Sequence, residues 1–322
     1  MSGAAATPQK KTMLWEKNPK IYVAGHRGMV GSALVRRLQA GGWHNLVLRT
    51  RAELDLCDGR AVADFFATEK PDVVFLAAAK VGGILANQQF KGDFIRENLL
   101  IQTHVIHESM RVGVQKLVFL GSSCIYPKFA PQPLVEDSLF TGKLEETNDA
   151  YAMAKIAGIT MCRAYVQQYG CPFFSVMPTN LYGPGDNYDL QTSHVLPAMI
   201  RKFHEAKVQG HEQMTLWGSG TPMREFLHVD DLADAVVYLA GLPAVPDLVN
   251  VGTGTDIAIR DLANLVADIV GYRGEILWDS SKPDGTPKKC LDVGLLHRLG
   301  WTHRIGLSEG IAATYRDFQI RN

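Results

Sequence analysis

The sequence has no excess of charge of either sign, few cysteines and no apolar run of membrane-spanning length. Lysine plus arginine equals aspartate plus glutamate, at 33 each among 322 residues, so we expect neither a nucleic-acid nor a membrane partner. The cysteines are scattered, without the spacing of disulfides or metal ligands. We therefore expect no metal site and a reducing, cytoplasmic location. The five cysteines are Cys57, Cys124, Cys162, Cys171 and Cys290.

Residues 1–17 lack the apolar segment of a secretory signal, and we expect a disordered tail there. The whole chain has an ordinary globular composition, with 46% apolar and 20% charged residues. Its length is sufficient for one large domain or two closely packed ones.

Short apolar runs alternate with longer helical patterns in residues 18–177. Strand, helix and strand joined by short links imply right-handed crossovers and a parallel sheet, and runs without polar alternation fit a sheet covered on both faces. The sequence therefore predicts an α/β fold with a Rossmann-type, doubly wound parallel sheet. The predicted strands are 20–25, 45–51, 71–79, 114–123 and 172–178.

The regular alternation of strand and helix patterns ends after Pro178. Residues 180–193 are rich in Gly, Asn and Asp and predict a long loop, which in a compact domain is usually functional or disordered. A helix is expected over 193–207, with Ser193 as its N-cap and His194 at its start, where the helix terminus lowers the histidine pKa. We expect 178–322 to form mainly a smaller α/β substrate lobe, with segments near 226–255 returning to the sheet.

A glycine pattern, Gly25-x-x-Gly28-x-x-Gly31, joins the first predicted strand to the first helix. In that context glycines allow a tight turn and close approach of a dinucleotide pyrophosphate to the helix N-terminus. The second strand ends in Arg49-Thr50-Arg51 rather than in an acidic residue, and Arg27 lies within the glycine turn. Guanidinium groups suit a 2′-phosphate, which favours NADP(H). Asp55, a few residues later, leaves NAD as the alternative.

Tyr151 and Lys155 lie four residues apart in a predicted helix, so their side chains are neighbours. A lysine beside a phenol favours the phenolate, so we expect the tyrosine to exchange protons nearer neutral pH. The fourth strand ends in Ser122 and Ser123, and the carboxyl ends of parallel strands meet ligands. Serine, tyrosine and lysine together predict a proton-transfer group beside a nicotinamide.

On these motifs, and on "PTNLYGP" after the fifth strand, the chain resembles the extended short-chain dehydrogenase/reductase family over nearly its whole length. Longer stretches narrow the resemblance to an NADPH-dependent member that acts on GDP-4-keto-6-deoxy-D-mannose, inverting C3 and C5 and then reducing C4. Those stretches are "GSSCIYP", "AAAKVGGILAN", "SHVLPAMIRKFHEA", "LWGSGTPMREFLHVDDLADA" and "KPDGTPKK".

The resemblance implies roles for individual residues. Cys124 and His194 are the implied epimerase pair, while Tyr151 protonates the C4 oxygen and Lys155 also binds the nicotinamide ribose. The implied GDP-sugar residues are Lys202, Trp217, Arg224 and Asp284. The cofactor residues are Gly25, His26, Arg27, Gly28, Met29, Val30, Gly31, Arg51, Asp55, Leu56, Ser122, Lys155, Pro178, Asn180, Leu181 and His194.

The resemblance also implies a homodimer, because related enzymes pair the helices of "ENLLIQTHVIHESM" and of Tyr151 across a two-fold axis, and C2 dimers are the commonest oligomer. Two other functions remain open. One is another nucleotide-sugar epimerase, dehydratase or ketoreductase of the same scaffold. The other is a non-catalytic NADP sensor, a class that tends to lose the tyrosine or the lysine.

Overall fold

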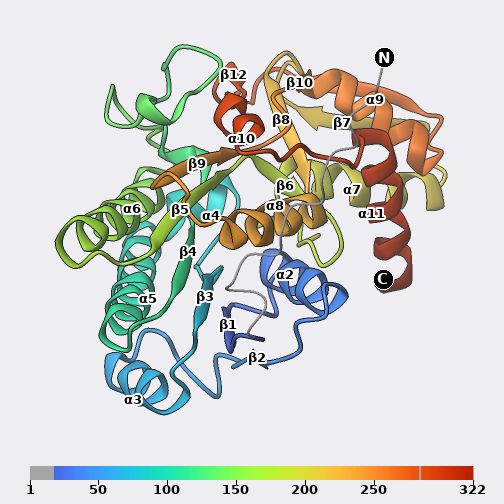
Figure 1. Cartoon of the computed structure of the whole chain (residues 1–322). Helices are drawn as coiled ribbons and strands as arrows, with labels where there is room; N and C mark the ends of the chain where they lie inside the picture. Colours follow the sequence, from blue (N-terminus) through green and yellow to red (C-terminus); the bar gives the residue numbers. More distant parts are fainter. Residues whose placement is uncertain (1–17, 283, 322) are drawn as a thin grey trace, which may run out of the picture.

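A computed structural model describes residues 18–282 and 284–321, so the expected tail at 1–17 lies outside the described residues. Its centre is a six-stranded sheet in the order β2-β1-β3-β4-β5-β9, and every pair of neighbours is parallel (Figure 1). The predicted fold class is confirmed. The strands are β2 (Leu46–Val47), β1 (Ile21–Ala24), β3 (Val73–Leu76), β4 (Lys116–Leu120), β5 (Phe173–Pro178) and β9 (Leu248–Val251).

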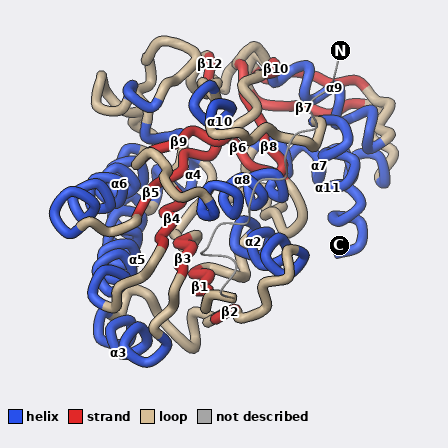
Figure 2. Tube along the Cα trace, in the orientation of Figure 1, coloured by secondary structure: helices blue, strands red, loops and turns tan. Residues whose placement is uncertain are grey.

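Helices cover both faces of this sheet, as the tube view shows (Figure 2). One face carries α3 (Gly59–Glu69), α5 (Lys91–Arg111) and α6 (Asp149–Tyr169), and the other carries α2 (Met29–Ala40) and α8 (Val229–Gly241). The residues of β1 and β3 are all buried, because a parallel sheet between two helical layers has no solvated face.

Smaller sheets lie beyond the carboxyl end of the large one. β8 (Met223–His228) pairs with β6 (Asn180–Tyr182) and β12 (Lys288–Lys289) in parallel and with β10 (Asp256–Ala258) antiparallel, while β7 (Gln213–Trp217) pairs with β11 (Glu275–Asp279). A second hydrophobic core lies under α7 (Val195–Val208), α9 (Ile259–Val270) and α11 (Leu307–Arg321). The shorter helices are α4 (Ile84–Gln89), α10 (Gly294–Arg298) and the 3₁₀ turns η1 (Ser123–Ile125) and η2 (Glu136–Ser138).

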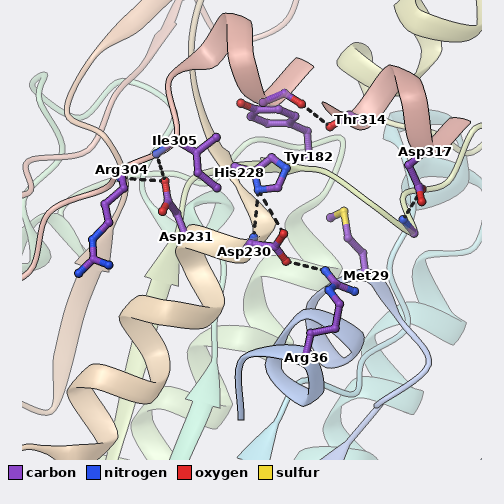
Figure 3. A network of polar contacts seen from close by, with 12 residues as sticks. Met29, Arg36, Tyr182, His228, Asp230, Asp231, Arg304, Ile305, Thr314 and Asp317 are labelled. Carbon is purple, nitrogen blue, oxygen red and sulfur yellow. Dashed lines mark hydrogen bonds and ion pairs between the residues drawn. The ribbon is translucent and has the colours of Figure 1, made fainter. Parts of the chain in front are cut away.

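Polar contacts tie the first helix to the segment around β8. Arg36 and Arg37 of α2 pair with Asp230 and Asp234 of α8, at 2.5 and 2.6 Å. The Asp230 N–H donates to Nδ1 of buried His228 at the end of β8 (Figure 3). The helix that follows the glycine turn is thereby fixed against the strand that leads toward the second core.

Three local predictions need correction. The second strand stops at Val47 instead of reaching residue 51, because a turn begins at Thr50, whose N–H donates to the Glu53 carboxylate. The expected loop 180–193 begins with β6, because Asn180 pairs in register with Phe226. The helix expected from Ser193 has His194 as its N-cap and starts at Val195.

α8 packs on the large sheet and β9 forms its edge, although both follow residue 178 in the chain. The division into two domains at residue 178 stays a prediction. Among the described residues, no helix is both long and apolar enough to cross a membrane.

Candidate active site

The glycine turn brings the start of α2 against the end of β1. Gly25 has φ +83°, and a Cβ there would lie 2.8 Å from the Ala78 backbone. A Cβ at Gly31 would lie 2.1 Å from the Gly25 carbonyl oxygen, so only glycine allows this approach. Gly28 is the N-cap without a side-chain cap, and the first turn of α2 has no acidic residue. Its N–H groups and positive helix end therefore fit a pyrophosphate.

The two arginines after β2 differ in what they contact. Arg49 bonds the Glu69 carboxylate at 2.6 Å and lies over the Phe65 ring. Within the described part of the chain, Arg51 makes only long contacts, 3.7 Å to Asp55 and to Glu97, and its side chain is 73% exposed. Exposed ion pairs contribute about 0–1 kcal/mol, less than the ~1.5–3 kcal/mol of a hydrogen bond to a charged group, so a 2′-phosphate can compete for Arg51.

The other residues assigned to the cofactor lie in the glycine turn, after β2 and at the end of β5. Arg27 is exposed, Met29 and Val30 begin α2, and His26 is partly buried, with no hydrogen-bond partner for its Nδ1 among residues 18–282 and 284–321. Leu56 is buried, and its carbonyl contacts His104 at 2.9 Å. Pro178 ends β5, and Asn180 and Leu181, in β6, are partly buried.

A short 3₁₀ turn after β4 places Ser122 and Cys124. Ser122 is extended, and its hydroxyl accepts a hydrogen bond from the Cys124 N–H at 3.4 Å. The preceding Gly121 leaves room for Met177, whose Cε would lie 1.7 Å from a Cβ at that position. β4 and β5 therefore stay close where they reach the site.

Tyr151 and Lys155 project from the first turns of α6. Gly158 lets this helix approach the sheet, because a Cβ there would lie 2.5 Å from the Phe119 ring. The Lys155 ammonium is almost fully buried, donates to the Leu120 carbonyl at 2.7 Å and lies 5.8 Å from the centre of the Tyr151 ring. The structure thus brings together the predicted serine, tyrosine and lysine.

Burial controls the ionisation of this group. Burial lowers the pKa of Lys155 to about 8. Burial also raises the pKa of Tyr151, with the Cys124 charge adding to the rise and a hydrogen bond from Ser122 opposing it. The expectation that Lys155 would draw the phenol toward its phenolate is therefore wrong in direction, because desolvation is the largest influence on the Tyr151 pKa. Tyr151 is a protonated phenol near neutral pH.

Cys124 and His194 share a charged neighbour, Lys289 of β12. Burial raises the pKa of Cys124, and Lys289 and Lys155 oppose that rise. Desolvation by neighbouring groups lowers the pKa of His194, and Lys289 lowers it further, although the residue as a whole is exposed. The pKa of His194 is lowered, as expected, but the causes are desolvation and the charge of Lys289 rather than the helix terminus alone.

A pocket opens beside Cys124. Lys289 and Cys124 both line it, as do Asn148 and the ion pair between Lys128 and Glu145, which are 2.9 Å apart. Lys289 was missed in the sequence, although it lies in the quoted stretch "KPDGTPKK". The available signal was the pair of lysines that ends this stretch; in the structure Lys289 pairs in register with Arg224.

The residues assigned to the GDP-sugar gather at β7 and β8. Trp217 is 60% exposed, and the ammonium groups of Lys202 and Lys282 each lie 5.6 Å from its ring centre. Lys282 was not predicted. Asp284 accepts hydrogen bonds from the Ser219 N–H and hydroxyl at 2.9 and 2.7 Å, so it also holds the turn after Trp217.

Arg224 comes from β8 and lies close to this group. Its Nη1 donates to the Met223 carbonyl at 2.8 Å, and a Cβ at Gly285 would lie 3.0 Å from its Nη2. Burial lowers the pKa of Arg224, and the charges of Asp284 and Glu145 oppose that lowering. The guanidinium stays charged and suits a diphosphate.

A parallel sheet with a glycine turn, next to a serine, tyrosine and lysine, defines a nucleotide-dependent oxidoreductase or epimerase. The chain belongs to the NAD dependent epimerase/dehydratase family, whose model matches residues 21–252. It is 57% identical to a putative GDP-L-fucose synthase 2 of Arabidopsis thaliana over 94% of this chain and 93% of that protein. It is 55% identical to the GDP-L-fucose synthase of Escherichia coli K12, over 93% and 96%.

Among solved structures, the chain is similar to a GDP-mannoheptose C4 reductase from Campylobacter jejuni with NADP bound. The TM-score is 0.86 and the identity 43%, with coverage of 94% of this chain and 98% of that one. This likeness extends over both the large sheet and the region of the smaller sheets.

Proposed function

We propose that this protein converts GDP-4-keto-6-deoxy-D-mannose to GDP-L-fucose, by epimerisation at C3 and C5 and NADPH-dependent reduction at C4. The observation that carries the proposal is that Cys124 and Lys289 line one pocket, directly after Ser122 at the carboxyl end of β4. A second acid/base group beside the reducing residues is what inversion of carbons next to a ketone requires.

The reducing side consists of Ser122, Tyr151 and Lys155. Bound NADPH would supply the hydride for C4. Tyr151, protonated near neutral pH because burial raises its pKa, donates its proton to the C4 oxygen. Ser122 bonds the same oxygen, and the buried Lys155 ammonium, fixed by the Leu120 carbonyl, stabilises the phenolate that remains.

The epimerising side consists of Cys124, His194 and Lys289. At each carbon beside the ketone, one group removes a proton to give an enolate, and another returns a proton on the opposite face. A neutral imidazole can accept a proton and a thiol can donate one, and these are the forms that the shifted pKa values favour. The Lys289 ammonium stabilises a Cys124 thiolate and destabilises a His194 imidazolium. Negative charge on Cys124 is therefore favoured over positive charge on His194.

The nucleotide lies, in this proposal, between Trp217 and Arg224. The exposed indole offers an apolar wall to the base, and the two lysines over its ring add positive charge. Arg224 binds the diphosphate.

We further propose NADP(H) rather than NAD(H) as the cofactor, a homodimer formed through α5 and α6, and a cytoplasmic location. Arg51 and Arg27 are exposed beside the glycine turn, which supports recognition of a 2′-phosphate. Met153 and Tyr169, on α6, are 49% and 53% exposed, which supports a second copy covering that helix.

A reductase that leaves C3 and C5 unchanged is the second candidate, because a similar structure is described as a C4 reductase. The first experiment mixes the protein with GDP-4-keto-6-deoxy-D-mannose and NADPH, follows the nicotinamide absorbance and identifies the sugar. Loss of NADPH with GDP-L-fucose formed supports the proposal. Loss with an unepimerised sugar supports the reductase, and tight NADPH binding without turnover supports a sensor.

A further inference from the structure

Glu225 is a fully buried carboxylate at the point where β8 meets the active site. Its Oε1 accepts hydrogen bonds from the N–H groups of Thr253 and Gly254, at 2.5 and 2.8 Å, and its Oε2 accepts one from the Leu291 N–H at 2.8 Å. Among the described residues it forms no ion pair. Backbone N–H groups therefore make most of the hydrogen bonds that replace the water lost when this carboxylate is buried.

The bond to Leu291 fixes the chain on one side of Glu225. Leu291 follows Lys289 by two residues, and Lys289 pairs in register with Arg224, the residue before Glu225. The carboxylate therefore sets how β12 lies along β8. That register brings the Lys289 ammonium to Cys124 and His194.

The backbone of Glu225 fixes a second segment. Its carbonyl oxygen accepts hydrogen bonds from Asn180 Nδ2 at 2.8 Å and from the Thr179 hydroxyl at 3.3 Å. These residues follow β5, where the nicotinamide is expected. Glu225 thus contacts both the Asn180 segment, which is expected to border the cofactor, and Leu291, which follows Lys289 by two residues.

We propose that Glu225 is a positioning residue, which holds the Lys289 strand and the Asn180 segment at the spacing that the acid/base chemistry needs. This role rests on the proposed function, and Glu225 acts only through its neighbours. A glutamine has the same shape but only one acceptor oxygen. Because two N–H groups bond Oε1 and one bonds Oε2, the amide oxygen of Glu225→Gln keeps Thr253 and Gly254, and its NH2 group faces the Leu291 N–H. β12 then loses its fixed register.

A purely structural role is the alternative, and the chain contains a matched control. Asp231 is equally a buried carboxylate that accepts two backbone bonds, from Arg304 and Ile305 at 3.1 and 2.8 Å (Figure 3). It holds the segment at Arg304 and Ile305 and, among the described residues, makes no hydrogen bond or ion pair with a proposed site residue. Asp231→Asn therefore reports what loss of such a carboxylate does to stability alone.

The first test uses the protein without substrate. The rate of Cys124 alkylation by iodoacetamide is measured against pH, with the modified peptide identified by mass spectrometry. Lys289 and Lys155 are the cations that face this thiol. We expect Glu225→Gln to raise the apparent pKa of Cys124 toward the value in Lys289→Ala, and Asp231→Asn to leave it unchanged. Gly252→Ala, whose Cβ would lie 2.1 Å from Glu225 Oε1, should act in the same direction.

The second test measures deuterium incorporation from solvent into the keto sugar with NADP⁺ present. Misplacement by about 1 Å costs on the order of 10²-fold, so we expect a loss of that size in Glu225→Gln, with NADPH affinity and the activity of Asp231→Asn retained. An unshifted Cys124 profile in folded Glu225→Gln overturns the assignment, as does failure of that variant to fold where Asp231→Asn folds. If the wild type incorporates no deuterium, the proposed function fails while the alkylation profile still decides the role of Glu225.

Discussion

The reducing side of the site comes from neighbouring parts of one sheet, whereas the epimerising side is assembled from three distant segments. Ser122 follows β4, and Tyr151 and Lys155 lie on the α6 helix that packs on β4. Cys124 lies in η1, His194 caps α7 and Lys289 lies in β12. The first group depends on local packing, and the second depends on how the smaller sheets meet the large one.

This difference indicates how one site can carry two reactions. The proton donor for reduction is held by α6, which packs on the large sheet, and by a lysine that donates to the Leu120 carbonyl at 2.7 Å. The acid/base groups for epimerisation depend on a charge from a two-residue strand. Substitutions on the two sides should therefore separate hydride transfer from proton exchange.

The largest effect is expected from Tyr151→Phe. Without the phenol, nothing on the reducing side donates a proton to the C4 oxygen, and general acid catalysis contributes about 10²–10⁴-fold. Oxidation of NADPH should fall by that factor, while deuterium exchange at the sugar carbons should fall less. NADPH affinity, measured by fluorescence, serves as the control for folding. Equal loss of both reactions would contradict the separation of the two sides.

Cys124→Ser should have the reverse effect. A serine hydroxyl has nearly the same size but a far higher pKa, so deuterium exchange should fall by about 10²-fold or more. Hydride transfer to a substrate that needs no epimerisation should persist. The two rates are compared on the same preparation, and parallel loss would count against the assigned role of the thiol.

Arg51→Glu tests the cofactor end. Loss of a charged hydrogen bond, about 1.5–3 kcal/mol, should weaken NADPH by roughly 10- to 100-fold and leave NADH nearly unchanged. Arg49→Gln is the matched control, because Arg49 is bonded to Glu69 and should affect stability rather than cofactor choice. The dissociation constants of NADPH and NADH are measured for both variants. Equal weakening of the two nucleotides in Arg51→Glu would show that Arg51 does not recognise the 2′-phosphate.

The fold was predictable where local signals agree. The glycine turn, the apolar strands and the spacing of Tyr151 and Lys155 each require only nearby residues, and the predicted parallel sheet is confirmed. Arg49 and Arg51 are alike in sequence, and the contacts of Arg49 with Glu69 and Phe65, which distinguish the two, appear only in the structure. The pKa direction of Tyr151 depends on burial, which spacing does not reveal. Lys289 reaches the site through pairing with β8, a contact between residues far apart in the chain.

The smallest effect, a shift rather than a loss, is expected from Lys289→Ala. The ammonium favours the Cys124 thiolate and so lowers the thiol pKa, and it disfavours the His194 imidazolium and so lowers the imidazole pKa. Removing it raises both values, so the pH profile of deuterium exchange should move upward by about one unit. Lys288→Ala is the control, because Lys288 pairs with Asp256 at 3.1 Å. A profile that stays in place or moves to lower pH would show that the epimerising side does not depend on β12.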